Sequence, residues 1–245
     1  MKREITVGVT THGNRCEWLR DMLNSLYYFS KISFKLVIVD NASIDNTLEY
    51  LSELSLQMKD LVVIKNKVNV DDSIGMNQIL EIIDTPYFLK IDTDTLFTNN
   101  GSVEKALRCL KTQRLSIVGP YWDLSLRRRK EINSWNHSQK MKMEFDRADN
   151  LVSKINHHFE VTVRLPRGNF MFLNTDDFRE IGGFDQNYHH NAMEYSLVMR
   201  LIEKGLDYGE YNDERVIHRP SDEIRLSIRK SIPDFLEFKA SLRKK

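Results

Sequence analysis

Residues 34–54 read FKLVIVDNASIDNTLEYLSEL and hold one complete strand-and-helix unit. The run FKLVIV is rich in β-branched residues and predicts a strand that ends where Asp40 begins a polar stretch. Asp45 is the expected N-cap of the helix that follows, because the leucines of residues 48–54 recur every third position along one helix face. This stretch therefore predicts a strand, a polar loop and a helix.

The same unit recurs on both sides of this stretch. Further strands are predicted at Ile5–Val9, Leu61–Ile64 and Tyr87–Ile91. Helical periodicity lies between them, with Asn14 and Ser73 at the expected helix starts. Strands that alternate with helices and are apolar almost throughout indicate βαβ units, and so an α/β fold with a parallel sheet buried on both faces.

The pattern changes after residue 100, and residues 121–166 show little periodicity. The expected elements are a helix over 103–110, strands at 115–118 and 168–173, helices over 176–181 and 193–204, and a last strand at 215–218. Neither a repeat nor a linker separates these parts. We therefore predict one domain over 1–220, with a nucleotide-binding half at 1–100, a sugar and acceptor half at 101–220, and a basic amphipathic tail at 221–245.

The composition excludes several classes of protein. The 245 residues include 36 Lys and Arg against 35 Asp and Glu, so the basic excess of a nucleic-acid-binding protein is missing and no nucleic-acid partner is expected. The 41% hydrophobic content argues against disorder, and 2 Cys argue against a disulfide scaffold. No apolar run reaches the roughly 18 residues of a membrane span, and the N-terminus lacks a signal-peptide pattern, so the expected location is the cytoplasm.

Polar side chains follow three of the predicted strands, where ligands of open α/β sheets bind. They are Thr10, Thr11 and His12 after the first strand, Asp40 after the second, and Asp92 and Asp94 after the fourth. Two carboxylates two residues apart at the end of a buried strand repel each other, and a divalent cation removes that cost. Hard oxygen ligands favour Mg²⁺ or Mn²⁺, which would neutralise the phosphates of a nucleotide. The alternative is that the two acids only cap the next turn.

Five motifs in order resemble the family 2 glycosyltransferases of the GT-A fold. They are VGVTTHGNR (7–15), KLVIVDNASIDNT (35–47), NVDDSIGMN (69–77), YFLKIDTDTLF (87–97) and GNFMFLNTDDFREIGGFDQNY (168–188). In the third motif Asp71 stands where the family usually has Gly, and Gly75 where it has Ala. The resemblance covers about residues 4–220 and implies a mixed, mostly parallel sheet of Rossmann type with helices on both faces.

The resemblance also implies roles for the site residues. The nucleotide-binding residues are Thr10, Thr11, His12, Asp40, Asp72 and Asp92, the metal ligands are Asp92, Asp94 and His218, and the sugar and acceptor pocket includes Gly168, Asn169, Gly183, Phe184 and Asp185. A neutral imidazole such as that of His218 is a sound ligand for Mn²⁺. The paired histidines, 157–158 and 189–190, are expected in loops, solvated or on the acceptor side.

The family commonly continues with E-D-x-D-L-x-x-R, whose second acid is the catalytic base, and this sequence has MEYSLVMR at 193–200. Alignment on Leu197 and Arg200 puts Glu194 at the base position, while Met193 and Ser196 replace acids. By chemistry alone, a carboxylate near an acceptor hydroxyl can take its proton as the oxygen attacks. The alternative is that Glu194 is a first-turn helix acid favoured by the helix dipole.

Basic residues gather in the second part of the chain. Residues 1–100 hold 10 Lys and Arg against 14 Asp and Glu, whereas residues 101–245 hold 26 against 21. The run at 127–130 and the tail are compatible with contact to a phosphate-bearing acceptor or the surface of an anionic inner membrane, and also with a plain solvated face. Trp122 and Trp135 flank the run, as sugar-stacking or as core residues.

The predicted function is that of a glycosyltransferase enzyme, which transfers a sugar from a UDP-, GDP- or dTDP-linked donor to a hydroxyl of a glycan, lipid-linked or protein acceptor. The resemblance implies inversion at the anomeric carbon, with Mn²⁺ or Mg²⁺ as the cofactor. Two alternatives stay open. One is a metal-dependent nucleotidyltransferase, and the other is a catalytically inactive sugar-nucleotide-binding homologue, which the replacements at Met193 and Ser196 favour.

Overall fold

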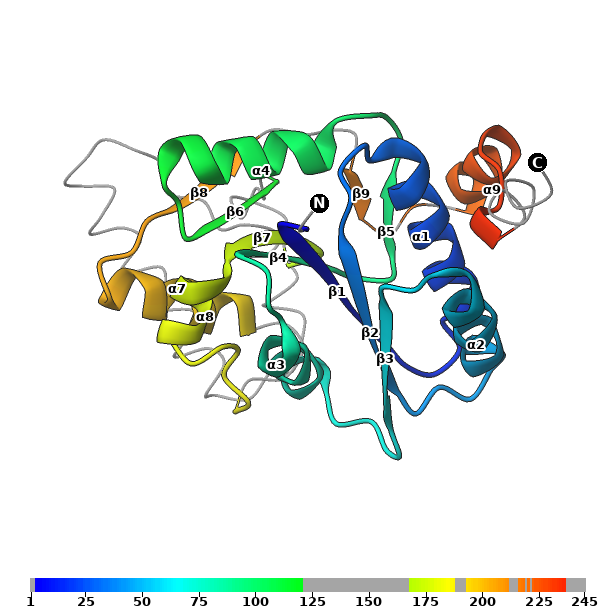
Figure 1. Ribbon diagram of the computed structural model, residues 1–245, viewed down its shortest axis with the longest axis horizontal. Helices are drawn as coiled ribbons and strands as arrows, with labels where there is room; N and C mark the ends of the chain where they lie inside the picture. Colours follow the sequence, from blue (N-terminus) through cyan, green and yellow to red (C-terminus); the bar gives the residue numbers. More distant parts are fainter. Residues whose placement is uncertain are drawn as a thin grey trace, which may run out of the picture.

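A seven-stranded sheet lies at the centre of the computed structural model, which describes residues 3–120, 168–187, 193–211, 216–218, 220 and 222–236 (Figure 1). The strand order is β3-β2-β1-β4-β7-β6-β8, and β5 and β9 form a separate two-stranded sheet. Several residues singled out in the sequence lie outside the described ranges, so their predicted roles stay predictions. They are Trp122, Trp135, the run 127–130, the histidines at 157, 158, 189 and 190, and the tail after 236.

The first four strands form the parallel part of the sheet, as predicted. They are β1 (Ile5–Thr11), β2 (Lys35–Asn41), β3 (Leu61–Asn66) and β4 (Tyr87–Ile91). β1 pairs in parallel with β2 and β4, and β2 pairs with β3. β1 and β2 each end two residues later than predicted, because Thr11 still pairs with Asp40. Their polar ends thus belong to the sheet and not to the loops that follow.

The rest of the sheet mixes directions. β7 (Phe170–Asn174) runs antiparallel to β4 and to β6 (Ile117–Pro120), while β8 (Tyr208–Tyr211) runs parallel to β6. β5 (Thr95–Phe97) and β9 (Val216–His218) pair antiparallel. Because β7 is antiparallel to β4, the start of β7 lies beside the carboxyl end of β4, with Phe170 paired to Ile91.

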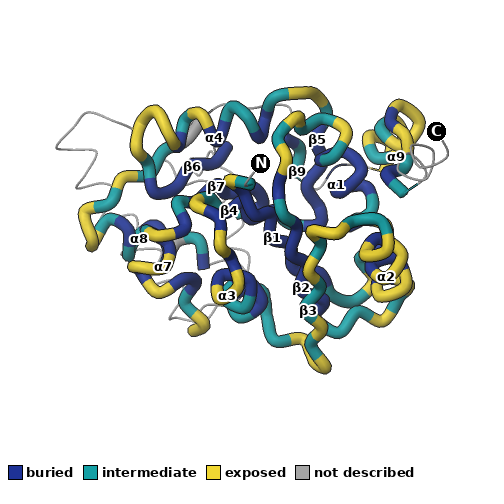
Figure 2. The backbone as a smooth tube through the Cα atoms, in the orientation of Figure 1, coloured by how far each residue is buried: buried dark blue, intermediate teal, exposed yellow. Residues whose placement is uncertain are grey.

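Helices cover both faces of the sheet, as predicted, and two apolar cores fill the space between the layers. One core includes side chains of α1 (Cys16–Phe29), α2 (Thr47–Gln57) and α4 (Ser102–Gln113). The other includes side chains of α3 (Asp72–Ile82), α7 (Thr175–Glu180) and α8 (Met193–Glu203). Figure 2 shows the central strands buried between the more exposed helices.

The helix starts differ from the predictions by a residue or so. Arg15, not Asn14, is the N-cap of α1, and Asp71 is the N-cap of α3, so α3 starts before Ser73. Asn46, not Asp45, is the N-cap of α2. The Asp45 carboxylate still accepts hydrogen bonds from the backbone N–H of Thr47 (3.0 Å) and of Cys16 (2.9 Å). It therefore satisfies an N–H at the start of two helices rather than one.

The basic tail begins with α9 (Asp222–Ser231), which packs against α1 (Figure 1). Asp21 of α1 is 4% exposed and accepts hydrogen bonds from the guanidinium groups of Arg225 (2.8 Å) and Arg229 (2.5 Å). Two of the basic side chains expected to face an anionic surface are thus used to attach the tail to α1. Among the described helices, none is long and apolar enough to cross a bilayer.

Candidate functional site

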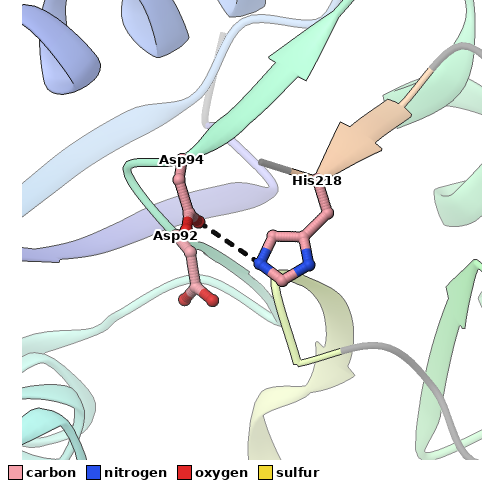
Figure 3. A group of neighbouring side chains, drawn as sticks. All are labelled: Asp92, Asp94 and His218. Carbon is pink, nitrogen blue, oxygen red and sulfur yellow. Dashed lines mark ion pairs between the residues drawn. The ribbon is translucent and has the colours of Figure 1, made fainter. Parts of the chain in front are cut away.

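The two aspartates after β4 meet His218 at one end of the sheet (Figure 3). Potential ligand atoms of Asp92, Asp94 and His218 all lie within 4.8 Å of one another. The turn that carries the aspartates is fixed by the backbone N–H of Asp92, which donates to the carbonyl of Asn169 (3.0 Å). His218 is far from the aspartates in the sequence, but β9 pairs with β5. This pairing places His218 opposite Thr95, beside the aspartates.

These three side chains fit a divalent cation by their chemistry. Two carboxylates and an imidazole form a mixed oxygen and nitrogen donor set that suits Mn²⁺ or Mg²⁺. His218 Nε2 lies 3.4 Å from Asp94 Oδ1, and Figure 3 shows the carboxylate facing the imidazole ring. Arg15 Nη1 lies 4.0 Å from the other carboxylate oxygen of Asp94. The three side chains thus form a set of candidate metal ligands, with the guanidinium group of Arg15 beside them.

A buried lysine that the sequence analysis did not single out lies next to this group. Lys90 of β4 is 0% exposed. Its ammonium Nζ donates to Asp92 Oδ1 (2.5 Å) and to the carbonyl oxygen of Gly168 (2.6 Å), and it lies 4.0 Å from Glu194 Oε1. The signal in the sequence was a charged residue inside the apolar strand YFLKI, since a lysine is rarely buried without a partner.

Glu194 lies in the first turn of α8, and its side chain is 16% exposed. It approaches the backbone of Gly168 so closely that a Cβ atom at position 168 would lie 1.8 Å from Glu194 Oε1. A side chain at 168 would therefore displace the Glu194 carboxylate from its observed place. The structure brings Gly168, Lys90, Asp92 and Glu194 together.

The charges of this cluster shift one another's protonation. Burial raises the pKa of Glu194 above its ordinary value; the ammonium of Lys90 opposes the rise and the carboxylate of Asp92 adds to it. Burial likewise raises the pKa of Asp92 against the opposing charge of Lys90. Burial alone would lower the pKa of Lys90, but Asp92 and Glu194 outweigh it, and that pKa lies above its ordinary value. The lysine therefore stays a cation among carboxylates that hold protons more tightly than usual.

Apart from Asp92, which follows β4, the predicted nucleotide-binding residues lie at the ends of β1 and β2 and at the start of α3. Asp40 is 1% exposed, and its carboxylate accepts a hydrogen bond from the backbone N–H of Ser43 (3.3 Å). The hydroxyl of Thr10 donates to the carboxylate of Asp72. Among the described residues, the buried hydroxyls of Thr11 and Ser43 have no hydrogen-bond partner. Such hydroxyls are available to a bound molecule. His12 follows directly after β1 and is partly exposed.

Asp71, at the position where the family usually has Gly, keeps a glycine-like backbone. Its φ is 77° and its ψ is 161°, a region populated essentially by glycine. Its carboxylate accepts a hydrogen bond from the N–H of Asp72 (2.8 Å), and its carbonyl accepts one from Gly75 (3.1 Å). At Gly75 a Cβ atom would lie 2.8 Å from Thr10 Cγ2. The replacements at 71 and 75 thus leave the loop in place, at the cost of backbone strain at Asp71.

The predicted pocket residues fall into two places. Asn169 is 3% exposed, and its amide Nδ2 donates to the Thr95 hydroxyl (3.1 Å) under the aspartate turn, next to Gly168. Gly183, Phe184 and Asp185 form a turn after α7 instead. Phe184 is 1% exposed and packs in the core against Phe178, with ring centroids 5.0 Å apart.

Two side chains hold the turn after α7. Asn77 of α3 accepts from the Phe184 N–H (2.8 Å) and donates to its carbonyl (2.8 Å). Arg200 of α8 donates to the carbonyls of Ile181 (2.6 Å) and Gly183 (2.7 Å). Gly183 has a φ of 74°, and a Cβ there would lie 2.4 Å from Asn77 Oδ1, so glycine is needed on both counts. Asn77 and Arg200 thus tie this turn to α3 and α8, the helices that carry Asp72 and Glu194.

Residues 6–165, more than half of the chain, match the sequence profile of Glycosyl transferase family 2. The chain belongs to this family. Membership confirms the resemblance drawn from the five motifs, and the inverting type expected from them is consistent with it. No curated protein sequence matches this family 2 chain significantly.

Several solved structures share the fold of this family 2 chain. Mannosyltransferase PcManGT from Pyrobaculum calidifontis, in complex with GDP-Man and Mn²⁺, matches with a TM-score of 0.65 and 16% identity, over 91% of this chain and 58% of that chain. S. aureus TarS 1–349 matches with a TM-score of 0.60 and 14% identity, over 92% and 63%. Its complex with UDP matches with a TM-score of 0.58 and 15% identity, over 87% and 59%.

These comparisons confirm the predicted GT-A architecture, an α/β fold with a mostly parallel sheet. At such low identity the likeness to the solved structures concerns the fold alone. The chain spans less than two thirds of the length of each of these three structures.

Proposed function

We propose that the chain transfers a sugar from a nucleoside-diphosphate donor to a hydroxyl group of an acceptor, with a divalent cation as cofactor. The observation that carries the proposal is the meeting of Asp92, Asp94 and His218 at the end of β4, with Glu194 joined to the group through Lys90. A family 2 profile and two structural neighbours whose complexes hold GDP-Man with Mn²⁺, or UDP, support it. The donor is UDP-, GDP- or dTDP-linked, and the acceptor is a glycan, a lipid-linked molecule or a protein.

Different residues of the chain would bind the nucleoside and the cation. Asp40 and Thr11 would hold the nucleoside, because a buried carboxylate accepts from a base or ribose donor and a buried hydroxyl has no partner within the described structure. Asp92, Asp94 and His218 would hold Mn²⁺ or Mg²⁺. When bound, the cation neutralises negative charge on the diphosphate.

Glu194 would act as the general base on the acceptor side. The acceptor oxygen forms a bond to the anomeric carbon while the bond from that carbon to the diphosphate oxygen breaks. The electron pair of the broken bond leaves with the nucleoside diphosphate, and the hydroxyl proton passes to the Glu194 carboxylate. The raised pKa of Glu194, caused by burial, makes this carboxylate a stronger base than an exposed glutamate.

Binding and product analysis test the proposal together. Thermal unfolding is measured with GDP-mannose, UDP-glucose and dTDP-glucose, each with and without Mn²⁺. A nucleotide sugar that binds the native chain raises its stability by about 2.7 kcal/mol at a hundredfold excess over its Kd. We expect one donor class to do so only with Mn²⁺, and to release nucleoside diphosphate once an acceptor is present.

Other outcomes identify the alternatives. Release of pyrophosphate from a nucleoside triphosphate and a sugar phosphate would identify a nucleotidyltransferase. Donor binding without release of nucleoside diphosphate, across glycan, lipid and peptide acceptors, would identify a sugar-nucleotide-binding homologue without activity. The replacements at Met193 and Ser196 make this second outcome worth testing, although a carboxylate is kept at 194.

A further inference from the structure

A lysine in the middle of a seven-stranded sheet needs a physical reason. Lys90 lies in β4, between β1 and β7, and is 0% exposed. It shares its face of β4 with Phe88, which packs in the core beneath α3 and α7. An ammonium group taken out of water is costly unless it is paired and hydrogen-bonded. An apolar residue would fill this position at less cost, so the charge itself has a use.

The contacts of Lys90 join two parts of the site. One partner is Asp92 Oδ1, 2.5 Å away, at the end of the same strand and in the candidate metal group. The other is Glu194 Oε1, 4.0 Å away, on α8. No backbone hydrogen bond described for the site links the aspartate turn to α8. The ammonium therefore lies between the two carboxylates whose separation matters for the proposed reaction.

Gly168 completes this arrangement at the entry to β7. Its carbonyl oxygen accepts a hydrogen bond from Lys90 Nζ (2.6 Å), which directs the ammonium toward the start of β7. Its missing Cβ leaves the space that the Glu194 carboxylate occupies. One residue thus orients the cation through its backbone and admits the anion through its lack of a side chain.

We propose that Lys90 is a positioning residue, which holds the acceptor-side carboxylate of Glu194 at a fixed place relative to the metal-side carboxylate of Asp92. The inference rests on the proposed function and deepens it. Lys90 has no exposed surface and acts through the two acids rather than on a substrate. Without its charge, the partly buried carboxylates of Glu194 and Asp92 would repel each other, and Glu194 would move away from the acceptor hydroxyl.

Lys90→Met tests the kinetic part, since methionine is unbranched and nearly as long but uncharged. A displacement of about 1 Å in a catalytic group costs about 10²-fold in rate. We expect kcat to fall about 10²-fold, while the KM for the donor changes by less than about threefold. Mn²⁺ binding, measured without nucleotide from the spectrum of free Mn²⁺, should persist. Lys35→Met is the matched control, because Lys35 pairs with Asp84 at the same 2.5 Å on the surface.

Two results would overturn the proposal. One is a kcat for Lys90→Met within about threefold of the unaltered chain. The other is loss of Mn²⁺ binding together with turnover, which would make Lys90 a general support of the aspartate turn.

A double-mutant cycle tests the link to Glu194 without any donor. Urea unfolding is compared for the unaltered chain, Lys90→Met, Glu194→Gln and the double variant. Lys90→Met should lower the folding equilibrium constant. We expect this decrease to be about tenfold smaller when residue 194 is already Gln, because the interaction between the two charges is then already lost. Equal losses in both backgrounds would overturn the proposal.

The cycle also separates this inference from the function on which it rests. If Lys90→Met fails to fold but the double variant folds, the coupling is supported; if neither folds, the lysine serves packing alone and the proposal is wrong. If the unaltered chain turns over no donor, the proposed function fails, and the cycle still reports whether Lys90 and Glu194 are coupled.

Discussion

Two buried charge clusters in this molecule are built in opposite ways. At the junction of α1 and α9, one carboxylate, Asp21, receives guanidinium groups from Arg225 and Arg229. At the end of β4, one ammonium, Lys90, faces the carboxylates of Asp92 and Glu194, and Asp94 follows on the next turn. In the first cluster the buried acid is paired with two cations, whose other partners, Glu17 and Asp222, are exposed, whereas in the second the acids outnumber the lysine that they surround.

The difference separates a structural cluster from a proposed binding cluster. Both oxygens of Asp21 accept hydrogen bonds from arginine, and Arg225 also lies over the ring of Trp18, 3.8 Å from its centroid. That cluster is complete within the chain. The cluster around Lys90 has an excess of negative charge that a divalent cation can complete. Acids at the carboxyl end of a buried strand therefore indicate a ligand when the cations of the chain do not balance their charge.

The largest effect is expected from Asp94→Asn. Removing one charge from the candidate metal group should lower the release of nucleoside diphosphate by about 10³-fold, because a bound cation contributes several kcal/mol at the transition state. Thermal unfolding without Mn²⁺ should change little. Asp176→Asn, at a side chain that is 90% exposed, is the control and should keep full activity. Near-normal turnover of Asp94→Asn would remove the metal assignment and, with it, the contrast between the clusters.

Asp21→Asn breaks the other cluster and should affect stability rather than catalysis. It leaves Arg225, whose side chain is 11% exposed, without its buried partner, which costs about 3 kcal/mol of unfolding free energy. Urea denaturation measures the loss, and turnover per folded molecule should stay unchanged. Asp222→Asn removes an exposed partner of the same arginine and should cost less than about 0.5 kcal/mol. Equal losses for both variants would contradict the structural role of Asp21.

Glu194→Gln should lower kcat by about 10²-fold, the usual contribution of a general base, with donor binding kept. Burial raises the pKa of Glu194, and a base acts only when deprotonated, so the rate of the unaltered chain should rise with pH as that raised pKa is passed. The variant should lose this rise. Glu203→Gln, at the exposed end of α8, is the control. A collapse of donor affinity instead would place Glu194 in the binding site.

The smallest effect is expected at Asp71, a residue near the candidate site whose backbone is strained. Asp71→Gly should raise the unfolding free energy by about 1 kcal/mol, since glycine adopts the observed φ and ψ freely and the strain exceeds the lost hydrogen bond to Asp72. Asp71→Ala keeps the strain, loses the hydrogen bond and should be less stable than the unaltered chain. Urea unfolding of the three chains gives the order of their stabilities. An Asp71→Ala variant more stable than Asp71→Gly would rule out strain.

Much of the fold could be predicted because its strands are continuous apolar runs. The predicted strand Tyr87–Ile91 has the observed bounds, and β3 begins at the predicted Leu61. Periodicity missed β5 and β8, which become apparent only through their pairing with β9 and β6, although β9 and β6 are equally short and were predicted. The ends of β1 and β2 were misplaced for a related reason. Polar residues such as Asp40 look like loop residues in the sequence but pair with a neighbouring strand.

The site could be predicted only where its residues sit at strand ends or in family motifs. Asp92 and Asp94 were found from their place after a buried strand, and His218 from the family resemblance. Lys90 was not found, because its partner Glu194 lies on a helix far along the chain, and a strand pattern does not show which distant acid makes a buried lysine tolerable. The role of Gly168 likewise depends on the approach of Glu194, which only the three-dimensional structure reveals.

The pairing of β5 with β9 has a consequence for how the molecule is made. It joins residues 95–97 to residues 216–218, so the imidazole reaches Asp94 only after nearly all of the described chain has been synthesised. A nascent chain that has completed β1 to β4 still lacks the third candidate ligand, His218. Contacts between such distant segments form late, because a long loop must close first. The fold thus delays assembly of the candidate metal group until residue 218 has been synthesised, and products truncated before this residue remain without it.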